Sequence, residues 1–168
     1  MSQKINNIFT LSIIVLIIFL DQGSKSFFIN YLKTLPGWKI SLMSFLDIVY
    51  SWNYGISFGM FSNYYQYSNN IFIIINSSIV IYLIVLLSKT ITRLEQIGFQ
   101  MIIAGALGNI IDRVIYGGVF DFIRLHYGSV DFPIFNIADT FITIGTIIII
   151  MDNLYSKKTK LLLSNDIK

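Results

Sequence analysis

Acidic and carboxamide side chains lie near one end of several long apolar segments of this chain. The set comprises Asp21, Asn109, Asp112, Asn136 and Asp139. An ionisable group in hydrocarbon costs at least ~2.5 kcal/mol even on a lenient insertion scale. An isolated polar residue in a span often only links helices, but several such residues near matching ends of their segments predict a functional site.

Two carboxylates in one site provide a way to cut a peptide. They cannot both ionise easily, so one of them keeps a proton. The ionised member can activate water, and the protonated member can protonate the leaving amine. Asp139 is one candidate, and the second is either Asp112 or Asp121, because spacing alone does not decide between them. Arg113 directly follows Asp112 and favours a structural ion pair for that residue.

Helical spacing relates further side chains to one another. Asn109 precedes Asp112 by three residues and therefore shares its helix face. Asp21 precedes Lys25 by four residues, which is the favourable order for an ion pair. Ser24 is adjacent to Lys25, and adjacent helix residues do not face each other, so the spacing disfavours a serine–lysine mechanism.

Composition disfavours several other kinds of site. The chain has no cysteine and one histidine, His126, which excludes thiolate chemistry and disfavours a histidine-rich metal site. We expect neither a metal nor another cofactor. No basic patch interleaved with aromatic residues indicates nucleic-acid binding. With 55% hydrophobic residues, 12% charged residues and a mean hydropathy of +0.70, the chain is typical of a small polytopic membrane protein.

Four apolar segments approach the ~20 residues that a membrane-spanning helix needs. They predict an all-α membrane protein with four transmembrane helices, organised as one integral-membrane domain over residues 1–168. The first segment lacks a small-residue cleavage site and is read as a retained helix. The segments cover residues 8–29, 71–87, 97–115 and 132–151.

Lysine and arginine residues give the orientation of these spans. Their bias places both termini in the cytoplasm, with a basic tail at 152–168 that faces lipid headgroups or solvent. Two loops, 30–70 and 116–131, then lie outside. The cytoplasmic side has Lys4, Lys89, Arg93, Lys157, Lys158 and Lys160, and the outer side has Lys33, Lys39 and Arg124.

The longer outer loop should fold, because a structureless loop of that length is unusual. Residues 45–52 are rich in β-prone types. Tyrosine and tryptophan are frequent in this loop, and both prefer the headgroup region. We therefore expect a small β-rich extracytoplasmic element on the membrane surface, and a loop that closes over bound peptide as a lid.

Helix rise, about 1.5 Å per residue, converts sequence position into depth. Asp21 and Asp112 lie ~20 Å and ~22 Å from the cytoplasmic starts of their spans, in a core ~30 Å thick. Asp139 lies ~10 Å below the outer start of the last span. All three are then ~8–10 Å beneath the outer surface, which predicts one site near the outer leaflet.

A small proton-coupled transporter is the alternative function. Acidic residues inside spans also serve proton relays. Here the polar groups gather near one surface, and the second span supplies little beyond Asn76 and a few hydroxyls. No inverted repeat is apparent, although such repeats are common in transporters. These features favour an enzyme.

Five strings, in order, resemble the motifs of lipoprotein signal peptidases, the signal peptidase II family. The resemblance spans about residues 20–143, and the four-span layout agrees with it. Two positions depart from the family pattern, Ala104 and Phe120, and neither removes a catalytic atom. The strings are DQGSK at 21–25, NYGISF at 53–58, GALGNIIDR at 105–113, VFDFI at 119–123 and FNIAD at 135–139.

The resemblance implies an aspartic endopeptidase of the bacterial cytoplasmic (inner) membrane. Such an enzyme removes signal peptides from prolipoproteins, just before a cysteine that carries a diacylglyceryl group. We expect a monomer whose partners are lipid-modified prolipoproteins and membrane lipids. By resemblance, the catalytic pair is Asp121 and Asp139. Residues that hold substrate or surround the pair match Asn53, Asn109, Arg113 and Asn136; the first motif matches Asp21 and Lys25; an ion-pair position beside Arg113 matches Asp112.

Overall fold

The computed structural model describes residues 7–55 and 65–165. Within these ranges, four helices are each long and apolar enough to cross a membrane. The predicted four-span, all-α class is therefore confirmed. The helices are α1 (Asn7–Leu32), α2 (Tyr65–Lys89), α3 (Arg93–Tyr116) and α4 (Ile137–Asn165).

The two loops that the sequence predicts outside, 30–70 and 116–131, contribute strands to one sheet. In the described part of the chain the strand order is β1-β2-β3-β4, with antiparallel neighbours. The expected β-rich element is therefore present. The sequence predicts only a loop at 116–131, and pairing with β2, which is remote in sequence, makes β3 a strand. After a short 3-10 turn, η1 (Pro36–Trp38), the strands are β1 (Lys39–Met43), β2 (Leu46–Asn53), β3 (Val119–Tyr127) and β4 (Val130–Asp131).

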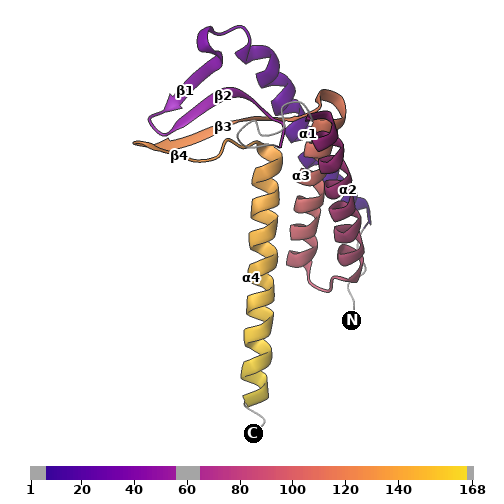
Figure 1. Ribbon diagram of the computed structural model, residues 1–168. Coiled ribbons are helices and arrows are strands. Elements are labelled where there is room, and N and C mark those ends of the chain that lie inside the picture. Colours follow the sequence, from indigo (N-terminus) through magenta and orange to yellow (C-terminus); the bar gives the residue numbers. More distant parts are fainter. Residues whose placement is uncertain (1–6, 56–64, 166–168) are drawn as a thin grey trace.

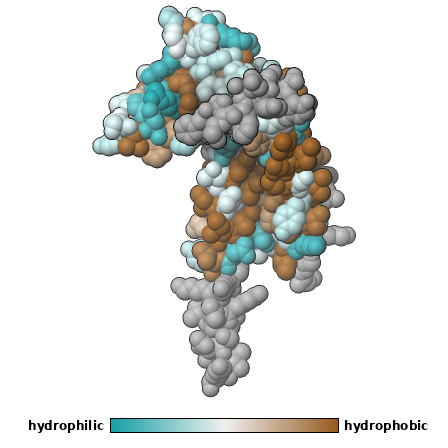
Figure 2. Space-filling model, viewed as in Figure 1, coloured by the Kyte–Doolittle hydropathy of each residue, from teal (hydrophilic) through white to brown (hydrophobic). Residues whose placement is uncertain are grey.

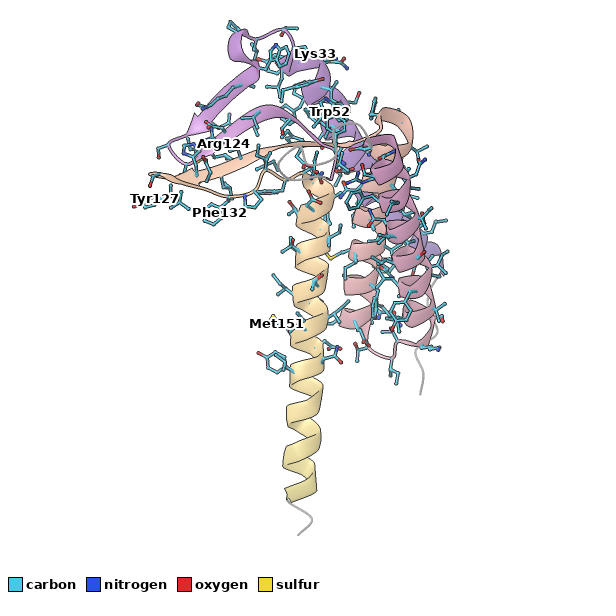
Figure 3. All side chains as sticks on the ribbon, viewed as in Figure 1. Lys33, Trp52, Arg124, Tyr127, Phe132 and Met151 are labelled. Carbon is cyan, nitrogen blue, oxygen red and sulfur yellow. The ribbon has the colours of Figure 1, made fainter. Side chains whose placement is uncertain are left out.

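The sheet and the helix termini lie at opposite ends of the molecule. In Figure 1 the sheet lies at one end of the helices, while α1 begins and α4 ends at the other. Figure 2 shows hydrophobic residues over the helices and a more hydrophilic surface at the sheet. Figure 3 places Tyr127 at the free end of the sheet and Trp52 where the sheet meets the helices. The single-domain organisation and the cytoplasmic location of the tail stay predictions.

Sequence signals explain the ends of α3. Thr92 caps its start, where Oγ1 accepts the N–H of Glu95 at 3.2 Å. Gly117 ends it in the left-handed conformation, with φ 75°, and donates its N–H to the carbonyl oxygen of Arg113. The helix is longer than the predicted span 97–115 because its polar first turn is helical too.

The last helix begins later than predicted. The apolar run predicts a span from residue 132, but α4 begins at Ile137. Phe135 instead pairs with Ile123 of β3, with N–H···O distances of 3.0 and 2.8 Å. Pro133 has no N–H and disfavours helix in the residue before it. The expected ~10 Å of helix before Asp139 is therefore wrong, because Asp139 lies in the first turn of α4, and its depth in the membrane stays a prediction.

Glycines let α3 and α4 approach closely. A Cβ atom on Gly105 would lie 2.5 Å from the carbonyl oxygen of Ala138 and 2.8 Å from Ile142 Cγ1. A Cβ atom on Gly145 would lie 2.6 Å from the carbonyl oxygen of Gly98. Backbone atoms cannot move aside as a flexible side chain can, so this contact requires small residues.

Gly105→Ala is expected to destabilise the protein by about 1–3 kcal/mol, because the added methyl group overpacks against the backbone of α4. The higher helix propensity of alanine, worth up to about 1 kcal/mol, is too small to offset this. Thermal unfolding in detergent measures the change. Gly23→Ala is the control, since nothing lies within 4 Å of the Cβ atom that it would add. A Gly105→Ala protein that melts as high as Gly23→Ala would contradict the close contact.

Candidate active site

A reciprocal cap at the start of α4 contains Asp139. Asn136 immediately precedes the helix, and its Oδ1 accepts the N–H of Asp139 at 2.9 Å. In return, Asp139 Oδ2 accepts the N–H of Asn136 at 3.2 Å. This is the geometry of a capping box, with asparagine and aspartate as the two capping residues. The cap explains why α4 starts here, and it fixes the orientation of the Asp139 carboxylate.

Strand β3 carries Asp121 on the face opposite its core side chains. Phe120 and Phe122, 0% and 2% exposed, pack with Leu32 and Ile48 in a core between α1 and the sheet. Successive side chains of a strand point to opposite faces. Asp121 therefore points away from this core, and Phe120, where the chain departs from the family pattern, anchors the strand.

Asn136 connects the two aspartates. Its Nδ2 donates to Asp121 Oδ1 at 2.7 Å, while its backbone N–H and its Oδ1 bind Asp139. Each acid also accepts a hydrogen bond from the carboxamide of another asparagine. Asn53 Nδ2, at the end of β2, lies 3.0 Å from Asp121 Oδ2. Asn109 Nδ2, on α3, lies 2.8 Å from Asp139 Oδ1. Side chains from β2, β3, α3 and α4 thus converge on one site.

The environment of Asp121 makes its carboxyl group easier to protonate than that of an ordinary aspartate. Burial is the main cause that raises the pKa of Asp121 to about 6, and the negative charge of Asp139 acts in the same direction. Hydrogen bonds from Asn53 and Asn136 act in the opposite direction, as does the charge of Lys25. Asp139 is only half-buried and lies at a helix N-terminus, where the helix dipole favours negative charge. Such a difference in environment separates an acid from a base.

A buried ion cluster connects α1 with α3. Lys25 Nζ lies 2.8 Å from Asp21 Oδ2 and 2.9 Å from Asp112 Oδ2. The three side chains are at most 3% exposed. The ion pair that spacing predicts for Asp21 and Lys25 is therefore present. Ser24 Oγ donates to the carbonyl oxygen of Asp21 at 2.8 Å, so its hydroxyl is directed to the helix backbone.

The expected ion pair between Asp112 and Arg113 is wrong. Besides Lys25, Asp112 accepts hydrogen bonds from Gln22 Nε2 at 2.9 Å and from the N–H of Phe120 at 3.1 Å. The Arg113 guanidinium lies 4.7 Å from the centroid of the Phe72 ring. Its Nε and Nη1 are buried, and neither has a hydrogen-bond partner among the described residues. Adjacent helix residues point in different directions, so adjacency in sequence does not create a pair.

Gln22 belongs to this site, although spacing gives no reason to select it. Its Nε2 lies 3.1 Å from Asp21 Oδ2, 2.9 Å from Asp112 Oδ1 and 3.1 Å from the carbonyl oxygen of Gly108. Gln22 is uncharged and directly follows Asp21, so helical spacing does not predict a partner for it. Its place in the string 21–25 is the only indication of its role.

The string at 53–58 is described only in part. Asn53 is placed at the site, and its Oδ1 accepts the N–H of Gly55 at 2.9 Å. Residues 56–64, which are part of the loop 30–70 predicted to act as a lid, lie outside the described residues.

The fold is that of bacterial membrane enzymes. One such enzyme, solved by the in meso method at 2.3 Å resolution, has a TM-score of 0.80 and 34% identity, over 95% of this chain and 96% of that one. A second, solved at 1.9 Å resolution, has a TM-score of 0.78 and 35% identity, over 92% of this chain and 97% of that one.

Sequence comparison identifies the family within this class. The family described as signal peptidase (SPase) II matches residues 13–155. The lipoprotein signal peptidase of Rickettsia akari (strain Hartford) is 51% identical over 147 residues, covering 88% of this chain and 75% of the relative. The lipoprotein signal peptidase of Rickettsia typhi (strain ATCC VR-144 / Wilmington) is 50% identical over 148 residues, covering 87% and 74%.

The chain belongs to the signal peptidase II family. It is therefore a protease and a multi-pass protein of the bacterial inner membrane, as its motifs and spans predict. Nothing in these matches supports the transporter alternative.

Proposed function

We propose that this chain is an aspartic endopeptidase that removes signal peptides from prolipoproteins, cutting just before a cysteine that carries a diacylglyceryl group. The observation that carries the proposal is the position of Asn136, which hydrogen-bonds to both Asp121 and Asp139. Relatives named lipoprotein signal peptidase support the substrate class.

In this mechanism the two acids have different roles. We assign Asp139 as the general base and Asp121, whose pKa is raised, as the general acid. Asp139 accepts a proton from a water molecule as the water oxygen attacks the scissile carbonyl carbon. The tetrahedral intermediate then loses its C–N bond, and Asp121 gives its proton to the leaving nitrogen. The products are the carboxyl terminus of the signal peptide and the free amino group of the cysteine.

Arg113 has donors available for the substrate. Its Nε and Nη1 are buried and have no partner in the described part of the chain, while the Phe72 ring supports the guanidinium. Leaving a buried charged donor unpaired is unfavourable, so a ligand that pairs with it gains affinity. We assign these donors to a backbone carbonyl of the bound peptide. Asn53 and Asn109 orient the two acids through the hydrogen bonds described above.

The site is proposed to lie near the outer leaflet, with both termini in the cytoplasm. Because α1 begins and α4 ends opposite the sheet (Figure 1), one orientation satisfies both expectations. A lipid-anchored cysteine is held at the membrane surface. The position of Asp139 in the first turn of α4, at the sheet end, supports action on a bond close to that surface. The expectations of a monomer, of lipid contacts and of metal-free catalysis stay predictions.

Paired pre-peptides test this function. The purified protein is incubated with a pre-peptide whose cysteine carries the diacylglyceryl group, and with the same peptide without lipid, both in the presence of a chelator. Mass spectrometry is expected to find a single cut, immediately before the lipidated cysteine, and none in the unmodified peptide. Equal cutting of both peptides, or a requirement for a divalent cation, would contradict the proposal.

A further inference from the structure

A buried carboxylate of α1 binds the backbone N–H of the residue directly before Asp139. Asp21 is 0% exposed, and its Oδ1 accepts the N–H of Ala138 at 2.9 Å. Ala138 lies in the first turn of α4, where backbone N–H groups have no partner within the helix. Asp21 therefore fixes the turn that carries Asp139 against α1.

A buried carboxylate of α3 does the same for Asp121. Asp112 is 1% exposed, and its Oδ2 accepts the N–H of Phe120 at 3.1 Å. Phe120 is the residue directly before Asp121 in β3. Asp112 therefore fixes the start of this strand against the end of α3. For both members of the proposed catalytic pair, a buried carboxylate thus binds the backbone N–H of the residue immediately upstream.

Lys25 connects these two holding carboxylates. Its Nζ lies 2.8 Å from Asp21 Oδ2, 2.9 Å from Asp112 Oδ2 and 3.1 Å from Asn109 Oδ1. These contacts occupy the three donors of an ammonium group. Asn109 in turn donates to Asp139 Oδ1 at 2.8 Å. The cluster therefore reaches Asp139 both through the backbone and through a carboxamide.

Gly108 provides the space that Asp21 occupies. A Cβ atom on Gly108 would lie 2.6 Å from Asp21 Oδ2. The glycine thus allows the carboxylate of α1 to lie directly against α3. It also gives a way to displace that carboxylate without changing any polar group.

We propose that Asp21, Lys25 and Asp112 are positioning residues, which set the separation and orientation of the two catalytic acids. The inference rests on the proposed function. These side chains act through peptide groups and through Asn109 rather than on the substrate. Their loss should therefore lower kcat more than it changes KM.

Asp112→Asn and Gly108→Ala test the positioning role with the lipidated pre-peptide. Asp112→Asn keeps an oxygen that can accept the Phe120 N–H but loses the charge that Lys25 binds. Gly108→Ala keeps every polar group and displaces the Asp21 carboxylate. In each case we expect kcat per folded molecule to fall about 10²-fold with little change in KM, because a displacement of ~1 Å at a catalytic group has such an effect.

Two control variants separate positioning from stability. Asp47→Asn removes another buried acid, 1% exposed, which pairs with Lys39 Nζ at 2.8 Å and lies 3.1 Å from His126 Nε2 in the sheet. Gly23→Ala adds a methyl group where nothing lies within 4 Å. Both should keep the wild-type kcat. Unchanged kcat in Asp112→Asn and Gly108→Ala, or an equal loss in Asp47→Asn, would overturn the inference.

The pH dependence of kcat/KM in Lys25→Met adds a second test, because a purely structural role of Lys25 would leave that dependence unchanged. The charged groups that act on Asp121 are Asp139 from α4, Lys25 from α1 and Arg113 from α3. The Lys25 cation lowers the pKa of Asp121, so its removal raises that pKa. Since cleavage requires protonated Asp121, the alkaline limb of kcat/KM should move to higher pH in Lys25→Met. Lys25→Arg, which keeps the charge, should leave the limb in place.

An unmoved limb in Lys25→Met would also overturn the inference. If Asp112→Asn fails to fold, Gly108→Ala decides the outcome, because it alters no polar group. Failure of the wild-type protein to cut the lipidated peptide would defeat the proposed function itself. Wild-type cutting combined with normal kcat in the positioning variants would defeat only this inference.

Discussion

Asp121→Asn and Asp139→Asn are each expected to abolish cleavage of the lipidated pre-peptide while the protein stays folded in the membrane. Asparagine has the shape of aspartate, but it can neither take a proton from water nor give one to the leaving amine. Each general acid or base contributes about 10²–10⁴-fold to the rate, so the loss should be at least of this size. Initial rates of product formation by the purified proteins measure it.

Asp131→Asn is the matched control for these two variants. Asp131 is an exposed acid of β4 that pairs with Arg124 Nη2 at 2.8 Å. Its replacement should leave turnover at the wild-type level. Substantial turnover by either Asp121→Asn or Asp139→Asn would show that the assigned pair does not carry the chemistry.

Arg113→Met should separate activity from stability. Loss of donors that hold the peptide backbone should weaken substrate binding and misplace the scissile bond, so we expect kcat/KM to fall about 10²-fold. The melting temperature should stay the same or rise, because the variant removes buried donors that have no partner in the described part of the chain. Methionine can also pack on the Phe72 ring that supports the guanidinium. Cleavage rates and thermal unfolding of the same preparation test both expectations.

Arg113→Lys distinguishes the shape of the cation from its charge. Lysine keeps the positive charge but lacks the planar fork of donors, so it should recover little of the lost activity. A melting temperature that falls in parallel with activity in Arg113→Met would instead assign Arg113 a structural role.

Most of the fold follows from local sequence signals. The first apolar run, 8–29, lies within α1. A single long apolar segment can satisfy its backbone hydrogen bonds in a membrane only as a helix. The predicted start of the last span at residue 132 is wrong. A short apolar segment can be extended or helical, and its composition does not distinguish the two. Pro133 and the capping residue Asn136 are the local signals that mark the true start at Ile137.

The site is less accessible from sequence because long-range pairing creates it. Asp121 cannot be separated from Asp112 by spacing, since β3 exists only when paired with the remote strand β2. The resemblance to known motifs selects Asp121 without explaining it. The N–H groups of Ala138 and Phe120 leave no signal at all, because every residue except proline has a backbone donor.

A pre-peptide analogue tests the central claim most directly, namely that Asp121 and Asp139 act together on one carbonyl group. In this lipidated analogue a secondary alcohol replaces the scissile carbonyl and imitates the tetrahedral intermediate. We predict that wild-type protein binds the analogue at least ~10²-fold more tightly than the substrate peptide. This difference in affinity between analogue and substrate peptide should disappear in both Asp121→Asn and Asp139→Asn and persist in Asp131→Asn. Equal affinity for the analogue in wild type and in both aspartate variants would contradict the shared site.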